Sequence, residues 1–293
     1  MTSPTIGFAG LGVMGEPICR NILTKSGAAL KVFDLKPDPV QRLETLGAHA
    51  ARTLAELAAE VDILFLSLPG GKQLEAVVRG PGGILETGRE GLLVVDMTTA
   101  PVGLTRELAD ELAARGINYA DAPVARTRQA AEDGTLSIMV GASREVFERI
   151  QPILAHAASE ITHCGPIGCG QVVKILNNMV LFETVVALSE ALALGKAAGV
   201  DAGLLFDTLS KGSADSFALR NHGMKAMLPD SFPEGAFPTD YALKDVSYAL
   251  ELAALTGYRT PGAELAKARM EKAREAGFAN AYFPALARVV DRT

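Results

Sequence analysis

The sequence has few cysteines, and their number and spacing argue against disulfide and zinc frameworks. Only three occur among 293 residues, namely Cys19, Cys164 and Cys169. A small, odd number is typical of free thiols in a reducing compartment, so we expect a cytoplasmic protein. His163 precedes Cys164, but no second Cys or His pair lies at zinc-ligand spacing. The sequence therefore predicts no metal site.

Long apolar runs and basic clusters are also lacking. No apolar run reaches the ~18 residues of a membrane-spanning helix, and Met1 to Pro4 has no basic stretch ahead of an apolar one. We therefore expect neither a membrane span nor a secretion signal. The formal net charge is −6, and no Lys and Arg cluster offers the basic face of a nucleic-acid-binding protein. A few well-placed cations can still bind a small anion.

Strand and helix patterns change near Gly165. Before it, short β-branched runs alternate with Ala- and Leu-rich segments, which predicts an α/β fold with βαβ units and a parallel sheet covered on both faces. The expected strands are Thr5–Ala9, Leu30–Asp34, Ile63–Ser67, Leu93–Met97, Ile117–Ala120 and Ser137–Val140. The helices expected between them include Pro17–Leu23, Leu54–Ala59 and Thr105–Ala114.

The rest of the chain predicts helices alone. The expected helices are the long Ala-, Leu- and Val-rich segment Gln171–Ala198, then Ala202–Ser210, Phe217–Met227, Tyr241–Thr256 and Pro261–Ala276. We therefore predict two domains, residues 1–165 and an all-helical domain of residues 166–293, joined by the long helix. The apolar faces of that helix predict burial by neighbouring helices or by a second subunit. We expect a homodimer or a homotetramer.

A glycine-rich turn follows the first expected strand. The stretch Gly10–Gly15 places G-x-G-x-x-G between a strand and a helix, the context of dinucleotide binding. Gly10 permits the tight turn, Gly12 lets backbone N–H groups approach a pyrophosphate, and Gly15 lets the helix pack on the strand. The alternative is a structural glycine turn. We predict a Rossmann-like domain with cofactor contacts at Gly10, Leu11, Gly12, Val13 and Met14.

Asp34 ends the second expected strand. It lies about twenty residues beyond Gly15, where an acidic side chain can accept hydrogen bonds from the adenosine ribose hydroxyls. A 2′-phosphate would meet this carboxylate, and like-charge contact is costly. The sequence therefore predicts NAD as cofactor, with Lys36 able to soften the discrimination against NADP. The alternative role of Asp34 is to cap the next turn.

Three polar residues near the start of the long helix share one face. Lys174, Asn177 and Asn178 are spaced i, i+3 and i+4. Polar groups on so apolar a helix are costly unless they are used. A lysine there can protonate an alkoxide that develops as hydride arrives, or take the proton in reverse. The alternative is a lysine that extends along the helix to solvent.

Several separated segments together resemble one enzyme family. In chain order they are Ile6–Gly15, Leu68-Pro69, Asp96–Thr99, Asp121–Val124, Asp133–Leu136, Gly168–Asn178 and Lys244-Asp245. On these segments, over essentially the whole chain, the sequence resembles the β-hydroxyacid dehydrogenases, which include 3-hydroxyisobutyrate dehydrogenase and tartronate semialdehyde reductase, with 6-phosphogluconate dehydrogenase as a larger relative. The resemblance implies a Rossmann-like domain, a helical domain and a site between them.

The resemblance also implies roles for individual residues. It implies NAD-linked interconversion of a small anionic β-hydroxy acid and its aldehyde, with Lys174 as the catalytic acid/base. Asn177 is implied to orient the substrate, with Asn178 as the close alternative. Lys244 is implied to close the site over nicotinamide and substrate. Cofactor contacts are implied for Leu68, Pro69 and Thr99.

The expected substrate loop departs from the family pattern. The family usually reads Asp-Ala-Pro-Val-Ser-Gly-Gly, whereas this chain has Ala125, Arg126 and Thr127 in place of the last three. The missing serine hydroxyl disfavours 3-hydroxyisobutyrate itself, and the Arg-Thr pair resembles the 3-sulfolactaldehyde reductase branch. We expect Arg126 and Thr127 to bind the anionic end of the substrate, because a guanidinium matches carboxylate or sulfonate oxygens. The alternative is that Arg126 points away and bridges a subunit contact.

Two other functions fit the same fold. One is a non-catalytic nucleotide-binding scaffold, and the other is an imine reductase. Relatives of both kinds typically lack the catalytic lysine. Its presence here, as Lys174, favours the dehydrogenase.

Overall fold

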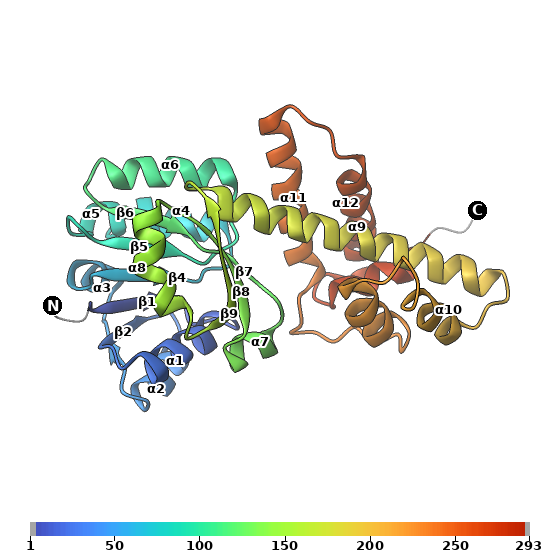
Figure 1. Ribbon diagram of the computed structural model, residues 1–293, viewed down its shortest axis with the longest axis horizontal. Coiled ribbons are helices and arrows are strands. Elements are labelled where there is room, and N and C mark those ends of the chain that lie inside the picture. The colour runs from blue at the N-terminus through green and yellow to red at the C-terminus, as the bar shows by residue number, and fades with distance from the viewer. Residues whose placement is uncertain (1–3, 291–293) are drawn as a thin grey trace. The chain divides into compact units, whose positions relative to one another are not determined.

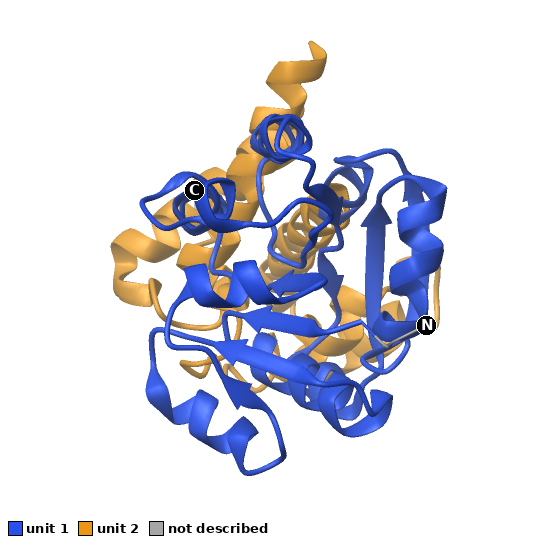
Figure 2. Cartoon of the chain, turned by 90° about the vertical axis from the view of Figure 1, so that its left-hand side faces the viewer, with its two compact units in different colours: residues 1–174 blue, residues 175–293 orange. Residues whose placement is uncertain are grey.

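The structure is a computed structural model that describes residues 4–290. The chain forms two compact units, residues 1–174 and 175–293 (Figure 2). The division falls inside helix α9 (Cys169–Ala197), so the helix start, including Lys174, belongs to the first unit.

Among the described residues, the first unit contains a nine-stranded sheet in the order β3-β2-β1-β4-β5-β6-β8-β7, with β9 paired to β8. The strands are β1 (Ile6–Ala9), β2 (Leu30–Phe33), β3 (His49–Ala50), β4 (Ile63–Leu66), β5 (Leu93–Asp96), β6 (Asn118–Asp121), β7 (Val124–Ala125), β8 (Leu136–Gly141) and β9 (Ala158–Gly165). The parallel pairing predicted from the sequence runs from β3 to β6. Strand β8 instead runs antiparallel to β6 and β7, because the chain turns back after β7.

Helices cover both faces of this sheet (Figure 1). They are α1 (Gly15–Ser26), α2 (Pro37–Glu44), α3 (Leu54–Glu60), α4 (Gly71–Arg79), α5 (Ile84–Thr87), α6 (Val102–Ala113), α7 (Arg128–Asp133) and α8 (Arg144–Leu154). Alternate strand residues enter two separate cores, so Phe8 and Phe65 pack with α1 and α8, and Leu64 packs with α3, α4 and α6. Burial on both faces explains why the central strands are continuously apolar.

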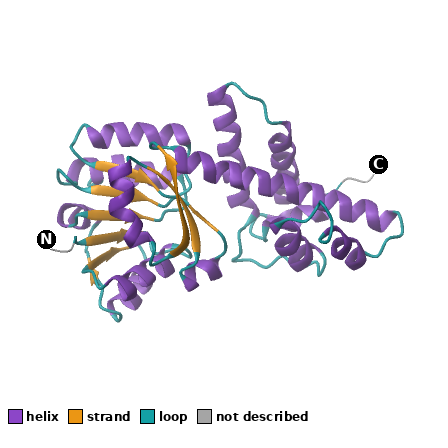
Figure 3. Cartoon of the chain, viewed as in Figure 1, coloured by secondary structure: helices purple, strands orange, loops and turns teal. Residues whose placement is uncertain are grey.

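The second unit is helical (Figure 3). After α9 come α10 (Ala202–Leu209), the π-helix η1 (Leu219–Met227), α11 (Thr239–Thr256), α12 (Pro261–Ala273), the π-helix η2 (Arg274–Phe278) and the 3₁₀-helix η3 (Phe283–Val289). Two isolated bridges, Glu234 with Ala281 and Pro238 with Tyr282, are its extended pairings in the described part of the chain. Phe182, Phe206 and Phe283 are fully buried in its core.

Helix α9 corrects one expectation from the sequence. Its mean hydropathy reaches 1.5, and by length and composition it is long and apolar enough to cross a membrane. The sequence-based statement that no apolar segment reaches that length is therefore wrong for this helix. Phe182, Val185 and Leu188 of α9 pack in the core of the second unit. A core helix of a soluble protein meets the same length and composition criteria.

Candidate functional site

The glycine-rich turn after β1 requires two of its glycines for its own shape. Gly10 has a φ of +90°, and a Cβ there would lie 2.3 Å from the carbonyl oxygen of Ser67. A Cβ on Gly15 would lie 2.0 Å from the carbonyl oxygen of Gly10. A Cβ on Gly12, in contrast, would meet no atom within 4 Å. The fold itself therefore does not require a glycine at position 12, and the open space there suits the close approach of a ligand.

Helix α1 begins at this turn with its N-terminus uncapped by a side chain. The N-cap residue, Met14, makes no side-chain hydrogen bond to the first turn, and Gly12 and Val13 are exposed. The first N–H groups of a helix lack intrahelical partners and carry the positive end of its dipole. An uncapped start beside open space at Gly12 therefore fits a pyrophosphate.

Asp34 connects the end of β2 to the glycine turn. Its Oδ2 accepts a hydrogen bond from the Leu11 N–H at 2.6 Å, and its Oδ1 accepts one from the Lys36 N–H at 2.8 Å. Asp34 therefore caps the turn that follows it, the alternative role considered from the sequence. The same carboxylate also lies against the predicted cofactor loop. A partly buried carboxylate in this position can face a ribose.

The loops after β4 and β5 are held together at the carboxyl ends of the parallel strands, the edge of the sheet at which the glycine turn also lies. The Leu68 N–H donates to the Thr98 hydroxyl at 3.0 Å, and the Ser67 N–H donates to the Ala9 carbonyl at 2.9 Å. Pro69 and Thr99 lie in these loops. Ligands of open α/β sheets bind outside the carboxyl ends of the strands. The structure thus brings the predicted cofactor residues of the first unit to one edge, while their contacts with a cofactor stay a prediction.

Two buried carboxyl groups lie next to each other at this edge. Asp96 ends β5 and Asp121 ends β6, and they are paired in register. Asp96 accepts hydrogen bonds from the Thr98 N–H and the Tyr119 hydroxyl, both at 2.9 Å. Burial raises the pKa of Asp96 to about 7, although these hydrogen bonds lower it. Burial likewise raises the pKa of Asp121 to about 6.

The start of α9 is attached to the sheet by buried hydrogen bonds. Asp121 accepts from the N–H groups of Gly168 and Gln171 at 2.7 and 2.8 Å. The Gln171 amide donates to the Thr98 carbonyl at 2.6 Å and accepts from the Ala100 N–H at 3.1 Å. Lys174, which is partly buried, follows one turn later. The predicted acid/base therefore extends from a helix start that is fixed to the edge carrying the cofactor loops.

Sequence reasoning missed Asp96, Asp121 and Gln171 as site residues. It used the first two only as parts of motifs. A signal was present, because each of these aspartates ends a buried strand, Leu-Val-Val-Asp and Asn-Tyr-Ala-Asp. An acidic residue rarely ends such a strand without hydrogen-bond partners.

The second unit holds a short chain of polar contacts. The Asn177 amide donates to the Asn178 oxygen at 3.1 Å, and the Asn178 amide donates to Asp245 at 2.8 Å. The Lys244 ammonium lies 3.1 Å from Asp245 and 5.3 Å from the ring centroids of both Tyr241 and Tyr248. Asn178 is only 4% exposed, whereas Asn177 is exposed. The structure therefore separates the two amides that the sequence left as alternatives.

The predicted substrate residues Arg126 and Thr127 make contacts within their own unit. Arg126 has a φ of +86°, which is rare for a side chain with a Cβ. Its guanidinium donates to the Thr135 carbonyl and to the Ser159 hydroxyl. The Thr127 hydroxyl caps α7 by accepting from the Ala130 N–H at 3.3 Å. Both residues are exposed, and their binding of a substrate stays a prediction.

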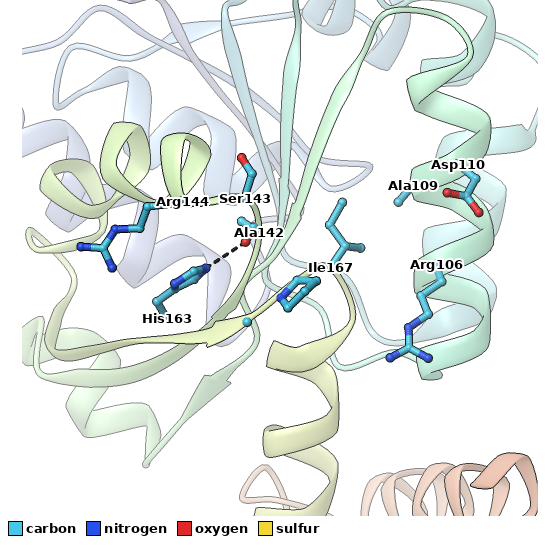
Figure 4. A pocket seen from close by; sticks show the side chains of 10 residues that line it. Arg106, Ala109, Asp110, Ala142, Ser143, Arg144, His163 and Ile167 are labelled. Carbon is cyan, nitrogen blue, oxygen red and sulfur yellow. Dashed lines mark hydrogen bonds between the residues drawn. The ribbon is translucent and has the colours of Figure 1, made fainter.

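A separate hollow of about 680 Å³ lies between α6, α8 and the end of β9. Figure 4 shows Arg106 and Arg144 on opposite sides of it, with the His163 ring bonded to the Ala142 carbonyl at 2.8 Å. No predicted site residue lines it. In the described part of the chain, no group of three His, Cys, Asp or Glu side chains is placed to hold a metal ion.

Two family models match the chain. One describes the NAD binding domain of 6-phosphogluconate dehydrogenase and matches residues 5–165. The other describes the NAD-binding region of NADP-dependent 3-hydroxyisobutyrate dehydrogenase and matches residues 168–290. These matches confirm the fold class, the cofactor type and the family resemblance inferred from the sequence.

Similar proteins cover nearly the whole chain. The 2-(hydroxymethyl)glutarate dehydrogenase of Eubacterium barkeri is 40% identical over 84% of this chain and 81% of its own. The 3-hydroxyisobutyrate dehydrogenase of Pseudomonas aeruginosa is 34% identical over 89% of both chains. The structure of Mycobacterium tuberculosis 3-hydroxyisobutyrate dehydrogenase with L-serine is 30% identical, covers 99% of this chain and 100% of its own, and has a TM-score of 0.89. The chain therefore belongs to the β-hydroxyacid dehydrogenase family and is an NAD(P)-dependent hydroxyacid dehydrogenase.

Proposed function

We propose that this enzyme oxidises a small anionic β-hydroxy acid to its aldehyde, or reduces the aldehyde, with Lys174 as general acid/base. The observation that carries the proposal is the anchoring of α9. Asp121 accepts buried hydrogen bonds from the N–H groups of the helix start, and the Gln171 amide of that start donates to the Thr98 carbonyl, so the helix is fixed to the end of the sheet that carries the glycine turn. Lys174 follows one turn along that helix, so cofactor loops and lysine share a rigid support.

The first unit offers a fitting place for the cofactor. Gly12 leaves open space at the uncapped start of α1, and Asp34 lies beside the turn. We propose that these residues bind the pyrophosphate and the adenosine ribose, and that Asp34 favours NAD over NADP. When bound, the nicotinamide supplies hydride acceptance or donation. Leu68, Pro69, Thr99 and Lys244 are the further proposed contacts.

Lys174 is proposed to accept and donate the proton of the reaction. During oxidation, a neutral lysine takes the hydroxyl proton as the carbon loses hydride and the carbonyl forms. During reduction, the protonated lysine returns that proton to the oxygen. Asn177 is the exposed amide of its pair and is our first choice for orienting the substrate. Asn178, which is buried and donates to Asp245, holds Asn177 in place or replaces it in that role.

The names of similar enzymes point to one substrate core. 2-(Hydroxymethyl)glutarate, 3-hydroxyisobutyrate and L-serine are the compounds named for proteins 40%, 34% and 31% identical to this one. Each is a 3-hydroxypropanoate with a different group at carbon 2. We propose a substrate of this type, or a hydroxysulfonate, with Arg126 and Thr127 at its anionic end. An imine reductase or a non-catalytic scaffold is disfavoured by Lys174, and the imine reductases at 17–19% identity share only the fold.

We also propose a cytoplasmic homo-oligomer, a homodimer or a homotetramer. Val173, Leu176 and Val180 lie at i, i+3 and i+7 on α9 and are 42%, 39% and 58% exposed. An apolar stripe of this kind favours burial by a second copy. A solution mass of 30.7 kDa at micromolar concentration would contradict this proposal.

The test of the proposed mechanism is Lys174→Ala. We expect turnover to fall by about 10²–10⁴-fold, the usual contribution of a placed acid/base, with NAD affinity nearly unchanged. Lys196→Ala is the matched control, because Lys196 is an exposed lysine in the last turn of the same helix and should keep native turnover. Steady-state rates and NAD titration decide the outcome. Near-native turnover in Lys174→Ala would remove this lysine from the mechanism.

A further inference from the structure

The carboxylate of Asp121 holds the two ends of the turn that leads into α9. Its Oδ1 accepts from the Gly168 N–H at 2.7 Å, and its Oδ2 accepts from the Gln171 N–H at 2.8 Å. Asp121 itself is 0% exposed. An anion at a helix start satisfies N–H groups that lack intrahelical partners and interacts favourably with the helix dipole. One side chain thus fixes both the position and the direction of the helix start.

Two glycines allow this close approach. A Cβ on Gly141 would lie 2.3 Å from Asp121 Oδ1. A Cβ on Gly170 would lie 2.7 Å from Asp121 Oδ2 and 2.4 Å from the Met139 carbonyl oxygen. Real Cβ atoms do not approach so closely, so the helix start, β8 and the carboxylate fit together only without side chains at these positions. Such a fit leaves the helix little freedom to shift.

Lys174 lies three residues beyond Gln171 on the same rigid helix. A small displacement of the helix start would therefore move the lysine by a similar distance. Misplacement of a reacting group by about 1 Å can cost about 10²-fold in rate. The neighbouring buried carboxyl, Asp96, bonds Thr98 and Tyr119 instead of α9. The two carboxyl groups thus support different parts of the site.

We propose that Asp121 is a positioning residue for catalysis, whose ionised carboxylate clamps the start of α9 and thereby holds Lys174 at the reacting oxygen. This inference rests on the proposed function, because it takes Lys174 to be the acid/base. It assigns Asp121 no contact with substrate or cofactor. Protonation of Asp121 would weaken the clamp, because one oxygen would then present a hydroxyl to an N–H donor. The titratable groups around Asp121 are Asp96, Tyr119 and Cys164.

The first experiment is Asp121→Asn, which keeps the shape but presents an amide NH₂ to one of the two N–H donors. We expect kcat to fall by about 10²-fold while the KM for NAD changes little. In a Lys174→Ala background, Asp121→Asn should cause no further loss of kcat, because both changes disable the same group. A merely structural role would instead lower kcat in both backgrounds alike.

Asn21→Ala is the control for stability. Asn21 is a buried amide of the same unit that donates to the Ala131 carbonyl at 2.9 Å and the Pro17 carbonyl at 3.0 Å. Its loss should lower Tm and leave kcat unchanged. Two results would overturn the clamp. One is a native kcat in Asp121→Asn. The other is a loss of kcat in both Asp121→Asn and Asn21→Ala that is proportional to the loss of Tm. If Lys174→Ala alone keeps native turnover, the proposed function fails instead.

The second experiment uses the wild-type enzyme and does not depend on the folding of a variant. The rate of aldehyde reduction is measured as a function of pH, because reduction needs Lys174 protonated and low pH does not deplete that form. Burial raises the pKa of Asp121 to about 6, so kcat should fall as pH decreases through that value. The fall should be absent in Asp121→Asn, and a wild-type kcat independent of pH from about 5 to 8 would contradict the clamp.

Discussion

The two units bury titratable groups in contrasting surroundings. In the first unit, Asp96 and Asp121 are carboxyl groups that accept hydrogen bonds at the edge of a sheet. In the second, His222 is 7% exposed among aromatic rings, with its Nδ1 2.5 Å from the Tyr282 hydroxyl and Nε2 without a hydrogen-bond partner among the described residues. Burial raises the pKa of Asp96 to about 7 and lowers that of His222 to about 4.

The difference shows that burial alone can give the stability of the two units opposite dependences on pH. Burial favours the neutral form of either group, which is the protonated acid for Asp96 and the unprotonated ring for His222. Low pH therefore stabilises the first unit through Asp96 and destabilises the second through His222. Carboxyl groups are kept in the first unit where they hold a loop and a helix start by hydrogen bonds, whereas the aromatic core of the second unit holds a neutral ring.

The largest expected effect concerns Asp34, the partly buried carboxylate beside the glycine turn of the first unit. Asp34→Arg removes the carboxylate that would repel the 2′-phosphate of NADP and puts a cation in its place. The ratio of kcat/KM for NADP over NAD should rise by about 10³-fold, since each tenfold corresponds to about 1.4 kcal/mol. Measuring both cofactors in wild type and variant checks it. A wild type that prefers NADP would contradict the assignment of Asp34.

Asp96→Asn tests whether Asp96 causes the expected loss of stability of the first unit at rising pH. With a pKa raised from 3.8 to about 7, the folded state holds a proton that the unfolded state has lost. The resulting stability is present below pH 3.8 and is lost as pH rises through 7, by up to about 4 kcal/mol. The variant should lack this loss. Urea unfolding of both proteins at several pH values measures the difference, and equal pH slopes would break the comparison.

His222→Phe tests the second unit with the opposite sign. The pKa of His222 falls from 6.5 to about 4, so the unfolded state binds the extra proton between those values. Stability is then lost as pH falls from 6.5 to 4, by up to about 3 kcal/mol. The phenylalanine variant should lose less stability over this range. Should wild type and variant lose stability in parallel below pH 6, His222 is not the responsible group.

The smallest expected effect concerns Arg126. Arg126→Ala should lower kcat/KM for an anionic substrate by about 10- to 100-fold, the loss of one charge-assisted contact, and leave an uncharged diol of the same size little affected. Arg128→Ala is the control, because Arg128 is a neighbouring exposed arginine paired with Glu132 at 2.9 Å. Equal losses on both substrates would mean that the bonds to Thr135 and Ser159 are the main role of Arg126.

The sequence predicted the parts of the fold that have local signals. The strands β1, β4 and β5 are mainly apolar, β2, β6 and β8 are short and mostly buried, and the glycine turn has a fixed spacing. Strands β3 and β7 have two residues each, and β9 is largely polar, so periodicity could not identify them. The antiparallel direction of β8 is set by the path of the chain and leaves no mark in an apolar run.

The sequence predicted only those parts of the candidate site whose residues lie together in one short segment. The glycine turn and the face with Lys174 are such segments. The contacts of Asp121 with Gly168 and Gln171 join residues 47 and 50 positions apart, and no spacing rule connects them. The positive φ of Arg126 was equally hidden, because the residue type disfavours the conformation that the loop imposes.

The measurement that tests the central claim most directly is NADH formation by the wild-type enzyme with a series of 2-substituted 3-hydroxypropanoates and one hydroxysulfonate. Matched uncharged diols serve as controls. We predict NAD-linked oxidation of at least one anionic compound, with kcat/KM about 10²-fold above its diol, as expected when a charge-assisted contact is lost. Absence of turnover with every anionic compound and both cofactors, or equal rates on acids and diols, would contradict the account.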